Sequence, residues 1–194
     1  MFEIVKNKIM YQASNWNYKI GQKVYFGKKR NYQAVRAFNK DIKMQNGQQA
    51  MMFLCEKAEQ NKNVSLNELK QLNEAMQDYA YSLREMGIEW CRKLYYPELP
   101  SRLRCMFLCE KEEEARAYLS TAKSKNENGE PKVIKVKLNG KLFKTSNSFN
   151  RRDLTFDGFV ENAHNYWKGV GKKFNDKSVE YLFEGWAEIV DIIS

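Results

Sequence analysis

The segment from Ser65 to Trp90 constrains the fold more than any other part of the sequence. Ser65-Leu-Asn-Glu68 has the pattern of a capping box, in which the serine hydroxyl accepts from the Glu68 N–H and the glutamate reaches back to the serine N–H. The apolar residues that follow keep one helical face apolar for about seven turns: Leu66, Leu69, Leu72, Met76, Tyr79, Leu83, Met86 and Trp90. Pro97 and Pro100 end this long helix, because proline lacks a backbone donor and disfavours helix in the residue before it.

Segments rich in β-branched and aromatic residues stand before and after this helix. Runs around Ile9 to Tyr11 and Lys23 to Phe26 are predicted strands, and a short buried strand is predicted at Leu103 to Cys109. Shorter helices are predicted at four places, from apolar spacing or an acidic first turn: residues 31–43, 47–60, 110–122 and 156–169.

The last third of the chain contains a turn signal. Asn139-Gly140 lies between apolar runs and suits a two-residue type I′ turn, so a β-hairpin is predicted there, after a polar loop at 124–131. Tyr181 to Ile193 is a predicted final strand region with a break at Gly185. The order of strands, a helical block and then strands with short helices indicates an α+β fold rather than a parallel α/β sheet.

The composition is that of a packed globular protein. Hydrophobic residues make up 43% and aromatic residues 13% of 194 residues, which fits a single domain spanning 1–194. No stretch approaches the roughly 20 apolar residues of a membrane span, and the first ten residues lack the apolar core of a signal peptide. We therefore expect a cytoplasmic protein with no membrane partner.

The few cysteine and histidine residues limit the kinds of metal site and catalytic site that the chain can form. Cys55, Cys91, Cys105 and Cys109 include no C-x-x-C pair, and His164 is the single histidine, so we expect reduced, mostly buried thiols and no metal site. The sequence also lacks a Walker A loop and the motifs G-x-G-x-x-G, H-E-x-x-H and G-x-S-x-G. An enzyme with this sequence must rely on carboxylates, hydroxyls and aromatic side chains.

The charge balance favours an anionic partner. The formal net charge is +9 at pH 7, and Lys and Arg gain affinity for phosphates by releasing counterions. Basic residues cluster at Lys28-Lys29-Arg30, Arg151-Arg152 and Lys172-Lys173. Salt-sensitive binding to RNA or DNA is therefore expected.

Three parts of the chain together resemble the ADP-ribosyltransferase superfamily. Residues 9–12 (IMYQ) and 19–24 (KIGQKV) resemble the first strand and turn of that fold. Residues 100–108 (PSRLRCMFL) and 113–118 (EEARAY) resemble a second block in a little-characterised bacterial branch. Residues 163–169 (AHNYWKG) and 179–185 (VEYLFEG) are similar to the end of the same branch and to a strand of DarT-type enzymes, which modify DNA. The resemblance implies split antiparallel sheets with a helical block between the early and late strands.

The resemblance also implies a reaction. The family breaks the nicotinamide–ribose bond of NAD, which is a substrate here, through an oxocarbenium-like state, and a carboxylate at the ribose 2′-hydroxyl stabilises the developing positive charge. That carboxylate would be Glu180. Glu184 is the alternative, because it lies on the same face of a strand if no bulge intervenes.

Further residues of the implied NAD pocket come from the same matched segments. Phe107 would stack on nicotinamide, Ser101 would supply a hydroxyl and Arg102 would pair with a pyrophosphate oxygen. Tyr11 and Tyr166 complete the set, while His164 is expected to be structural. Gln12 occupies the position where the family usually has a His or Arg that contacts the NAD ribose. A glutamine can still form hydrogen bonds there, but it carries no charge.

The functional hypothesis is a mono-ADP-ribosyltransferase that modifies RNA or DNA as a toxin or phage-defence effector, with an antitoxin protein as a further partner. Two alternatives remain open at this point. One is an ADP-ribosyltransferase with a protein target, and the other is an inactive nucleic-acid-binding module of the same fold.

Overall fold

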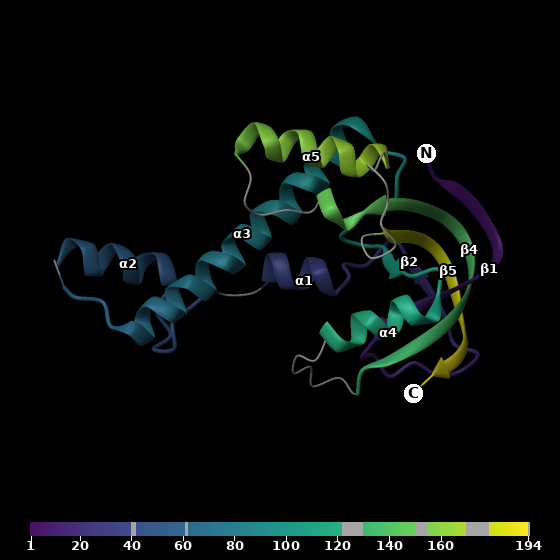
Figure 1. The fold of residues 1–194 in the computed structure, drawn as a ribbon, viewed down its shortest axis with the longest axis horizontal. Helices are drawn as coiled ribbons and strands as arrows, with labels where there is room; N and C mark the ends of the chain where they lie inside the picture. The colour runs from purple at the N-terminus through teal and green to yellow at the C-terminus, as the bar shows by residue number, and fades with distance from the viewer. Residues whose placement is uncertain (40–41, 61, 122–129, 150–154, 170–178, 194) are drawn as a thin grey trace.

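The computed structural model describes residues 1–39, 42–60, 62–121, 130–149, 155–169 and 179–193. Their strands form one antiparallel sheet with the order β1-β4-β5-β2, and β3 also pairs with β5 (Figure 1). The strands are β1 (Glu3–Ser14), β2 (Lys23–Phe26), β3 (Met106–Leu108), β4 (Lys132–Ser146) and β5 (Val179–Ile193). The α+β class is confirmed, but the described strands lie in one sheet where split sheets were expected.

The sheet curls until its two ends meet. Cys109, the residue after β3, forms a backbone bridge with Tyr11 of β1, so the ring of pairings runs from β1 through β4, β5 and β3 back to β1. The face inside this curl carries a buried cluster drawn from four strands: Val5, Met10, Met106, Leu108, Ile134, Val136, Leu138, Leu142, Tyr181, Phe183, Ala187 and Ile189. None of these residues comes from a helix, so among the described residues the sheet covers its own inner face.

The predicted hairpin at Asn139-Gly140 is wrong, because β4 runs straight through it. Gly140 lies opposite Gly185 of β5, and a Cβ atom on Gly140 would come within 2.3 Å of the Glu184 carbonyl oxygen. The Asn139 side chain accepts a hydrogen bond from the N–H of Asn7, at a bulge in β1. The pair therefore permits a close approach of two strands rather than a turn, and Gly185 likewise does not break β5.

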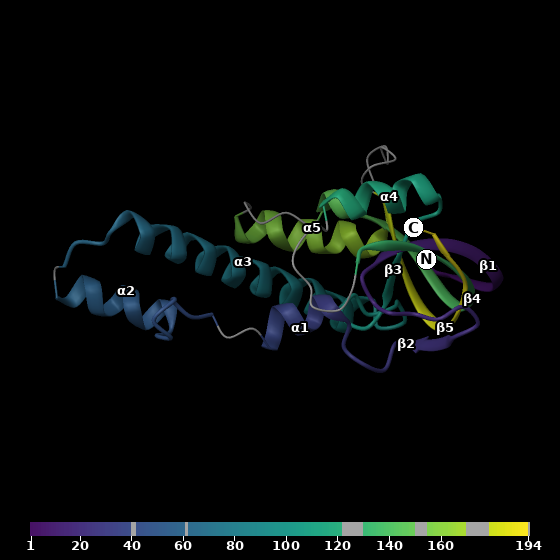
Figure 2. The ribbon, with the colours of Figure 1, turned by 90° about the horizontal axis from the view of Figure 1, so that it is seen from below.

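Five helices are described, and three of them cover the outer face of the sheet (Figure 2). The helices are α1 (Tyr32–Asn39), α2 (Ala50–Glu59), α3 (Leu66–Tyr95), α4 (Glu112–Thr121) and α5 (Phe156–Lys168). Phe143 and Leu182 on the outer face pack with residues of α3 and α5, while α4 packs against β1 and β4. The short 3₁₀ helix η1 (Asn147–Phe149) follows β4.

Most boundaries agree with local sequence signals. The capping box is confirmed: Ser65 Oγ accepts from the Glu68 N–H at 3.3 Å, and the Glu68 carboxylate accepts from the Ser65 N–H at 2.7 Å. Thr155 caps α5, and Gly169 ends it in the left-handed conformation. The predicted strand at 103–109 shrinks to three residues, and most of the predicted polar loop at 124–131 lies outside the described residues, as do Arg151-Arg152 and Lys172-Lys173.

The apolar residues that recur along one face of α3 are mostly exposed, although the sequence pattern predicted that this face would be buried. Of that pattern only Leu72 is buried, while Leu69, Met76, Leu83 and Trp90 are exposed. The first half of α3 extends away from the sheet and packs with α2 around a small separate cluster that contains Phe53 (Figure 1). The second half turns a partly charged face toward the sheet, and it is this face that builds the candidate site.

All four cysteines are free thiols, and Cys55 is exposed whereas the other three are buried. Burial raises the pKa of the Cys91 and Cys105 thiols, and burial together with Glu114 and Glu180 raises the pKa of Cys109 to about 12. No helix within the described ranges combines the length and the hydropathy that a membrane span requires.

The close approach of β4 and β5 at Gly140 predicts that adding a single methyl group there lowers the stability of the protein. Gly140→Ala should lower the free energy of unfolding by about 1–3 kcal/mol, because the new Cβ would displace the backbone of β5. Lys135→Ala, five residues away on β4, is the control and should change it by less than about 0.5 kcal/mol. Urea unfolding measures both, and equal effects would contradict the close approach.

The thiols offer a test of the core. At about pH 8 one thiol, Cys55, should react quickly with an aromatic disulfide reagent, because the thiolate is the reactive form and the other three thiols are buried. In denaturant all four should react. Cys55→Ser should abolish the fast phase, and a fast phase that persists in this variant would show that the buried cysteines are accessible.

Candidate active site around Glu180

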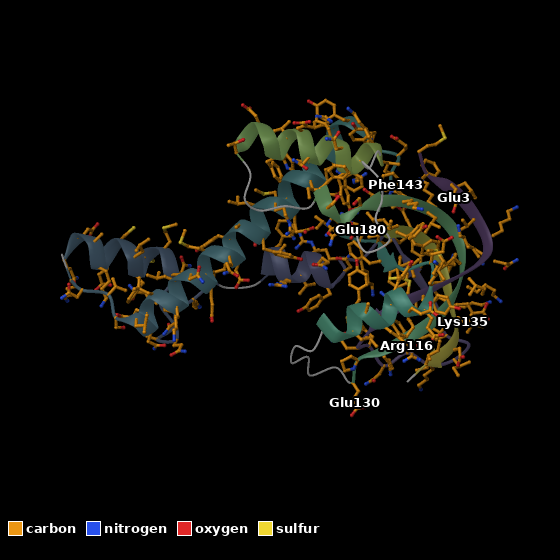
Figure 3. The ribbon with its side chains drawn as sticks, in the orientation of Figure 1. Glu3, Arg116, Glu130, Lys135, Phe143 and Glu180 are labelled. Carbon is orange, nitrogen blue, oxygen red and sulfur yellow. The ribbon has the colours of Figure 1, made fainter. Side chains whose placement is uncertain are left out.

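A buried cluster of charged side chains lies between the outer face of the sheet and the helices. Glu180 is the second residue of β5, Tyr166 lies near the end of α5, Glu85 is in the second half of α3, and Arg102 lies in the turn between Pro100 and β3. Figure 3 labels Glu180, where the sheet meets the helices. The four residues come from four separate parts of the chain, yet the first three all contact Arg102.

Arg102 is the centre of this cluster and is only 3% exposed. Its Nε donates to Glu85 Oε2 at 2.9 Å, and its Nη1 donates to Tyr166 Oη at 2.7 Å and to Glu180 Oε1 at 2.5 Å. The Phe107 ring lies 5.0 Å from the guanidinium carbon, within the range of a cation–π contact. Charge-assisted bonds of this kind hold the carboxylates in fixed directions.

The two oxygens of Glu180 are in different situations. Oε1 accepts hydrogen bonds from both Arg102 and the Tyr166 hydroxyl. Oε2 accepts none from a described residue, and it is not among the buried polar atoms sealed from solvent. The residue is 9% exposed, and this carboxylate has one oxygen anchored by two donors and one without a hydrogen bond from a described residue.

The positive charge of Arg102 is shared between the carboxylates of Glu85 and Glu180. Burial opposes the charge on Arg102, but Glu180, Tyr166 and Glu85 outweigh it and hold the pKa of the guanidinium well above its usual value. Burial and the carboxylate of Glu180 raise the pKa of the Tyr166 phenol, which therefore stays a hydrogen-bond donor. Burial, and then the charge of Glu180, also raise the pKa of the Tyr118 phenol in α4.

Neutral hydrogen bonds fix the frame of the cluster. Thr145 lies opposite Glu180 in the β4–β5 ladder, and its hydroxyl donates to the Tyr166 carbonyl at 2.6 Å, which joins α5 to β4. The indole of Trp167 donates to the Ile88 carbonyl at 2.7 Å and joins α5 to α3. The aromatic residues of this helix thus pack structurally, while the Tyr166 hydroxyl reaches the carboxylate.

A second polar group lies one helical turn further along α3. Glu89 Oε1 accepts from Ser101 Oγ at 2.9 Å and from Arg92 Nη2 at 2.9 Å. Glu89 Oε2 is buried and has no hydrogen-bond partner among the described residues. Because Ser101 and Arg102 are neighbours in sequence, one corner of the chain binds two successive acidic residues of α3, Glu85 and Glu89.

The predicted site residues separate into two sets. Glu180, Arg102, Tyr166 and Phe107 come together in the cluster, and Ser101 lies beside it. The other two lie elsewhere, on β1. Tyr11 packs near Cys109, and Gln12 lies opposite Ile134, so the alternation of side chains puts it on the inner face, where its Oε1 is buried without a partner from the described part of the chain.

Other candidates fall outside the cluster or were missed. Glu184 packs beside Gly27, four residues along β5 from Glu180. His164 lies between Tyr95 and Tyr96, with its Nδ1 3.2 Å from the Tyr96 hydroxyl, in keeping with a structural role. The sequence analysis did not predict Glu85. The one available signal is that Glu85 is an acidic residue in the second half of a helix that has many apolar positions.

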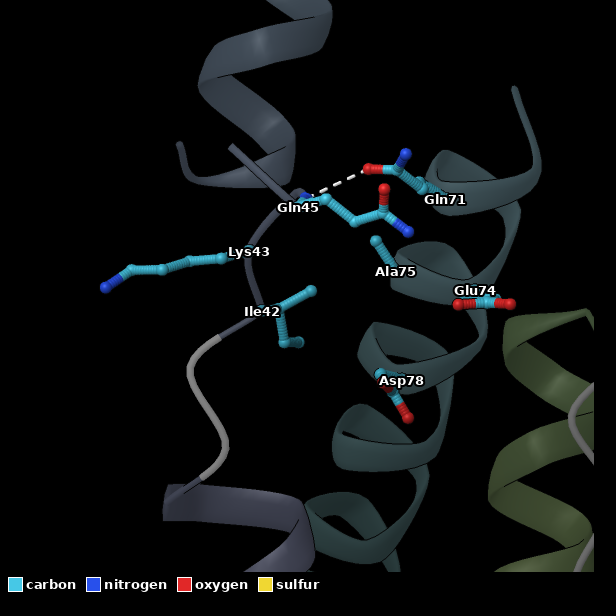
Figure 4. A pocket seen from close by; sticks show the side chains of 7 residues that line it. All are labelled: Ile42, Lys43, Gln45, Gln71, Glu74, Ala75 and Asp78. Atoms are coloured by element: carbon cyan, nitrogen blue, oxygen red, sulfur yellow. Dashed lines mark hydrogen bonds between the residues drawn. The ribbon is translucent and has the colours of Figure 1, made fainter. Parts of the chain in front are cut away.

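Two surface hollows lie outside the cluster, and neither is lined by Glu180, Arg102, Tyr166 or Glu85. One, of about 120 Å³, lies between the segment after α1 and the first half of α3, where the Gln45 N–H donates to Gln71 Oε1 at 2.9 Å (Figure 4). It shares no residue with the Glu180 cluster. The other, of about 210 Å³, is bordered by Glu89 and Ser101 and by the exposed Trp90. Among the described residues there is no group of three His, Cys, Asp or Glu side chains suited to a metal ion.

The cluster predicts a large effect of removing its central cation. Arg102→Met should lower the free energy of unfolding by about 3–5 kcal/mol, because Glu180 would lose the cation that compensates its burial and Glu85 would keep only its ion pair with Arg84. Arg116→Met removes the same group from an exposed pair on α4 and should cost about 0–1 kcal/mol. Urea unfolding compares them, and similar losses would mean that the cluster makes no special contribution.

Comparison with known proteins assigns the chain to a family. A search of curated proteins finds no match. A family model described as "Protein of unknown function (DUF2441)" matches residues 1–194. Because this match covers the whole sequence, the chain belongs to the DUF2441 family.

Proposed function

We propose that this chain transfers ADP-ribose from NAD to an acceptor, with Glu180 as the catalytic carboxylate. The observation that carries the proposal is the asymmetry of Glu180: Oε1 is anchored by Arg102 and Tyr166, whereas Oε2 has no partner among the described residues. A carboxylate fixed in this way can present one oxygen to a substrate without reorganising, which is the condition for strong electrostatic stabilisation.

The proposed reaction uses that free oxygen. The bond between the nicotinamide nitrogen and ribose C1′ breaks, and nicotinamide leaves with the bonding pair. Glu180 Oε2 accepts a hydrogen bond from the ribose 2′-hydroxyl and stabilises the positive charge that develops on the ring. A lone pair of the acceptor then bonds to C1′, and the acceptor loses a proton to water.

Arg102 and Tyr166 act as positioning residues in this proposal. Contact between Arg102 and the NAD pyrophosphate was expected, but its Nε and Nη1 are engaged by Glu85, Tyr166 and Glu180, and the side chain is buried. The partly exposed ring of Tyr118, whose phenol is influenced by the charge of Glu180, is the aromatic group that we assign to nicotinamide alongside Phe107.

The net charge of +9 supports a nucleic acid as the acceptor. One observation favours the inactive alternative: the ion pair with Arg102 offsets the charge of Glu180. Measuring nicotinamide release from NAD, with RNA, DNA or protein extract as acceptor, separates an enzyme from a binding module.

The catalytic assignment predicts a difference between two glutamates of one strand. Glu180→Gln keeps the size of the side chain but removes its charge, and it should lower the rate of nicotinamide release by about a hundredfold or more. Glu184→Gln is the matched control, because its side chain packs beside Gly27 away from Arg102, and it should retain most activity. The reverse order would contradict the assignment, and folding of both variants is checked by thermal unfolding.

A further inference from the structure

The larger hollow lies between α1, α3 and the corner that contains Ser101. Its volume is about 210 Å³, and its rim combines two kinds of side chain. Four are apolar, namely Phe38, Met86, Trp90 and Leu103, and three are cationic, namely Arg30, Lys93 and Arg104. Ligand sites for drug-sized molecules occupy about 300–1,000 Å³, so this hollow suits a smaller group than a whole dinucleotide.

The aromatic part of the rim is unusually open. Trp90 projects from α3 and is 64% exposed, and Met86 is exposed one turn before it on the same helix. Phe38 on α1 supplies a second ring, 5.7 Å from the guanidinium carbon of Arg30. An exposed indole next to cations offers a surface on which a planar base can stack, since every base has a π-face.

The charge of the hollow is positive. The nearest carboxylate, Glu89, forms an ion pair with Arg92 at 2.9 Å, so its charge does not neutralise Lys93 or Arg104. Lys28 and Lys29 precede Arg30 in the chain and extend the basic surface. Phosphate groups on either side of a bound base would meet these cations.

The hollow is also lined by a glutamate, Glu89, one oxygen of which is sealed from solvent and unpartnered among the described residues. Glu89 is 5% exposed and lines the hollow, and its Oε2 is buried with no hydrogen-bond partner in the described ranges. A buried acceptor without a partner is unfavourable, and a ligand donor would relieve it once the Glu89 side chain turned this oxygen toward the hollow. Exocyclic amino groups and ring N–H groups of nucleobases are such donors, and carboxylates accept from them.

We infer that this hollow binds one unstacked base of a single-stranded nucleic acid, with stacking on Trp90 and with Arg30, Lys93 and Arg104 toward the backbone. Stacked and paired bases in a duplex cannot enter a hollow of this kind, whereas single strands expose both faces and edges. This inference concerns binding alone, and it holds whether or not the chain transfers ADP-ribose.

The experiment measures fluorescence anisotropy of labelled oligonucleotides, without NAD, on the full chain. Single strands of about eight nucleotides, RNA and DNA, should bind more tightly than a duplex of the same sequence. Trp90→Ala should weaken single-strand binding about tenfold or more, and Trp90→Phe should restore much of it. Lys93→Ala should lower the slope of log affinity against log salt by about 0.7.

Two controls make the result decisive. Trp16→Ala removes another exposed indole, far along the sequence from the hollow, and should leave affinity unchanged. Poly-glutamate serves as a competitor that offers charge without bases and should compete weakly. Unchanged affinity in Trp90→Ala, equal binding of duplex, or full competition by poly-glutamate would overturn the inference, and a preference between RNA and DNA would identify the natural strand.

Discussion

The guanidinium of Arg102 joins three parts of the chain that are far apart in sequence. It binds Glu85 of α3, Tyr166 of α5 and Glu180 of β5, and it is almost completely buried while doing so. A buried cation is tolerated only when its charge and its donors are satisfied, so the helices and the sheet must meet in one arrangement. The packing of α3 and α5 on the outer face therefore depends on a polar contact within an otherwise apolar interface.

The close approach of β4 and β5 is the second constraint on the fold. Gly140 and Gly185 lie opposite each other, and neither position has room for a Cβ atom. The bulge at Asn7 in β1 is fixed by the Asn139 side chain at the same level of the sheet. These contacts let the long strands curl together, and as a result the inner face needs no helix to cover it.

Local signals in the sequence predicted local structure well. The capping box and the stop at Pro97 each act through a few neighbouring atoms, and both are present. Asn139-Gly140 failed because the same pair permits either a turn or a close strand approach, and only the distant β5 decides between them. The apolar pattern of α3 failed for a similar reason. Its buried residues are chosen by distant parts of the chain, α2 beside the first half and Arg102, α5 and the sheet beside the second. In the candidate site, Glu180, Arg102 and Tyr166 were predicted from sequence segments that resemble a known family. Glu85 lies in no such segment, so the sequence did not predict it.

The Ser101-Arg102 corner lies between the two proposed sites. Arg102 turns toward Glu85 and Glu180, and Ser101 donates to Glu89, one turn further along α3. Residues four apart on a helix lie on the same side, so the two acidic residues present one continuous polar edge to the corner. At one end of that edge, Glu85 binds Arg102, which in turn holds Glu180. At the other end, Glu89 lines the hollow that has basic and aromatic side chains on its rim. A strand held by its base at the hollow would therefore pass close to the corner whose arginine positions the proposed catalytic carboxylate.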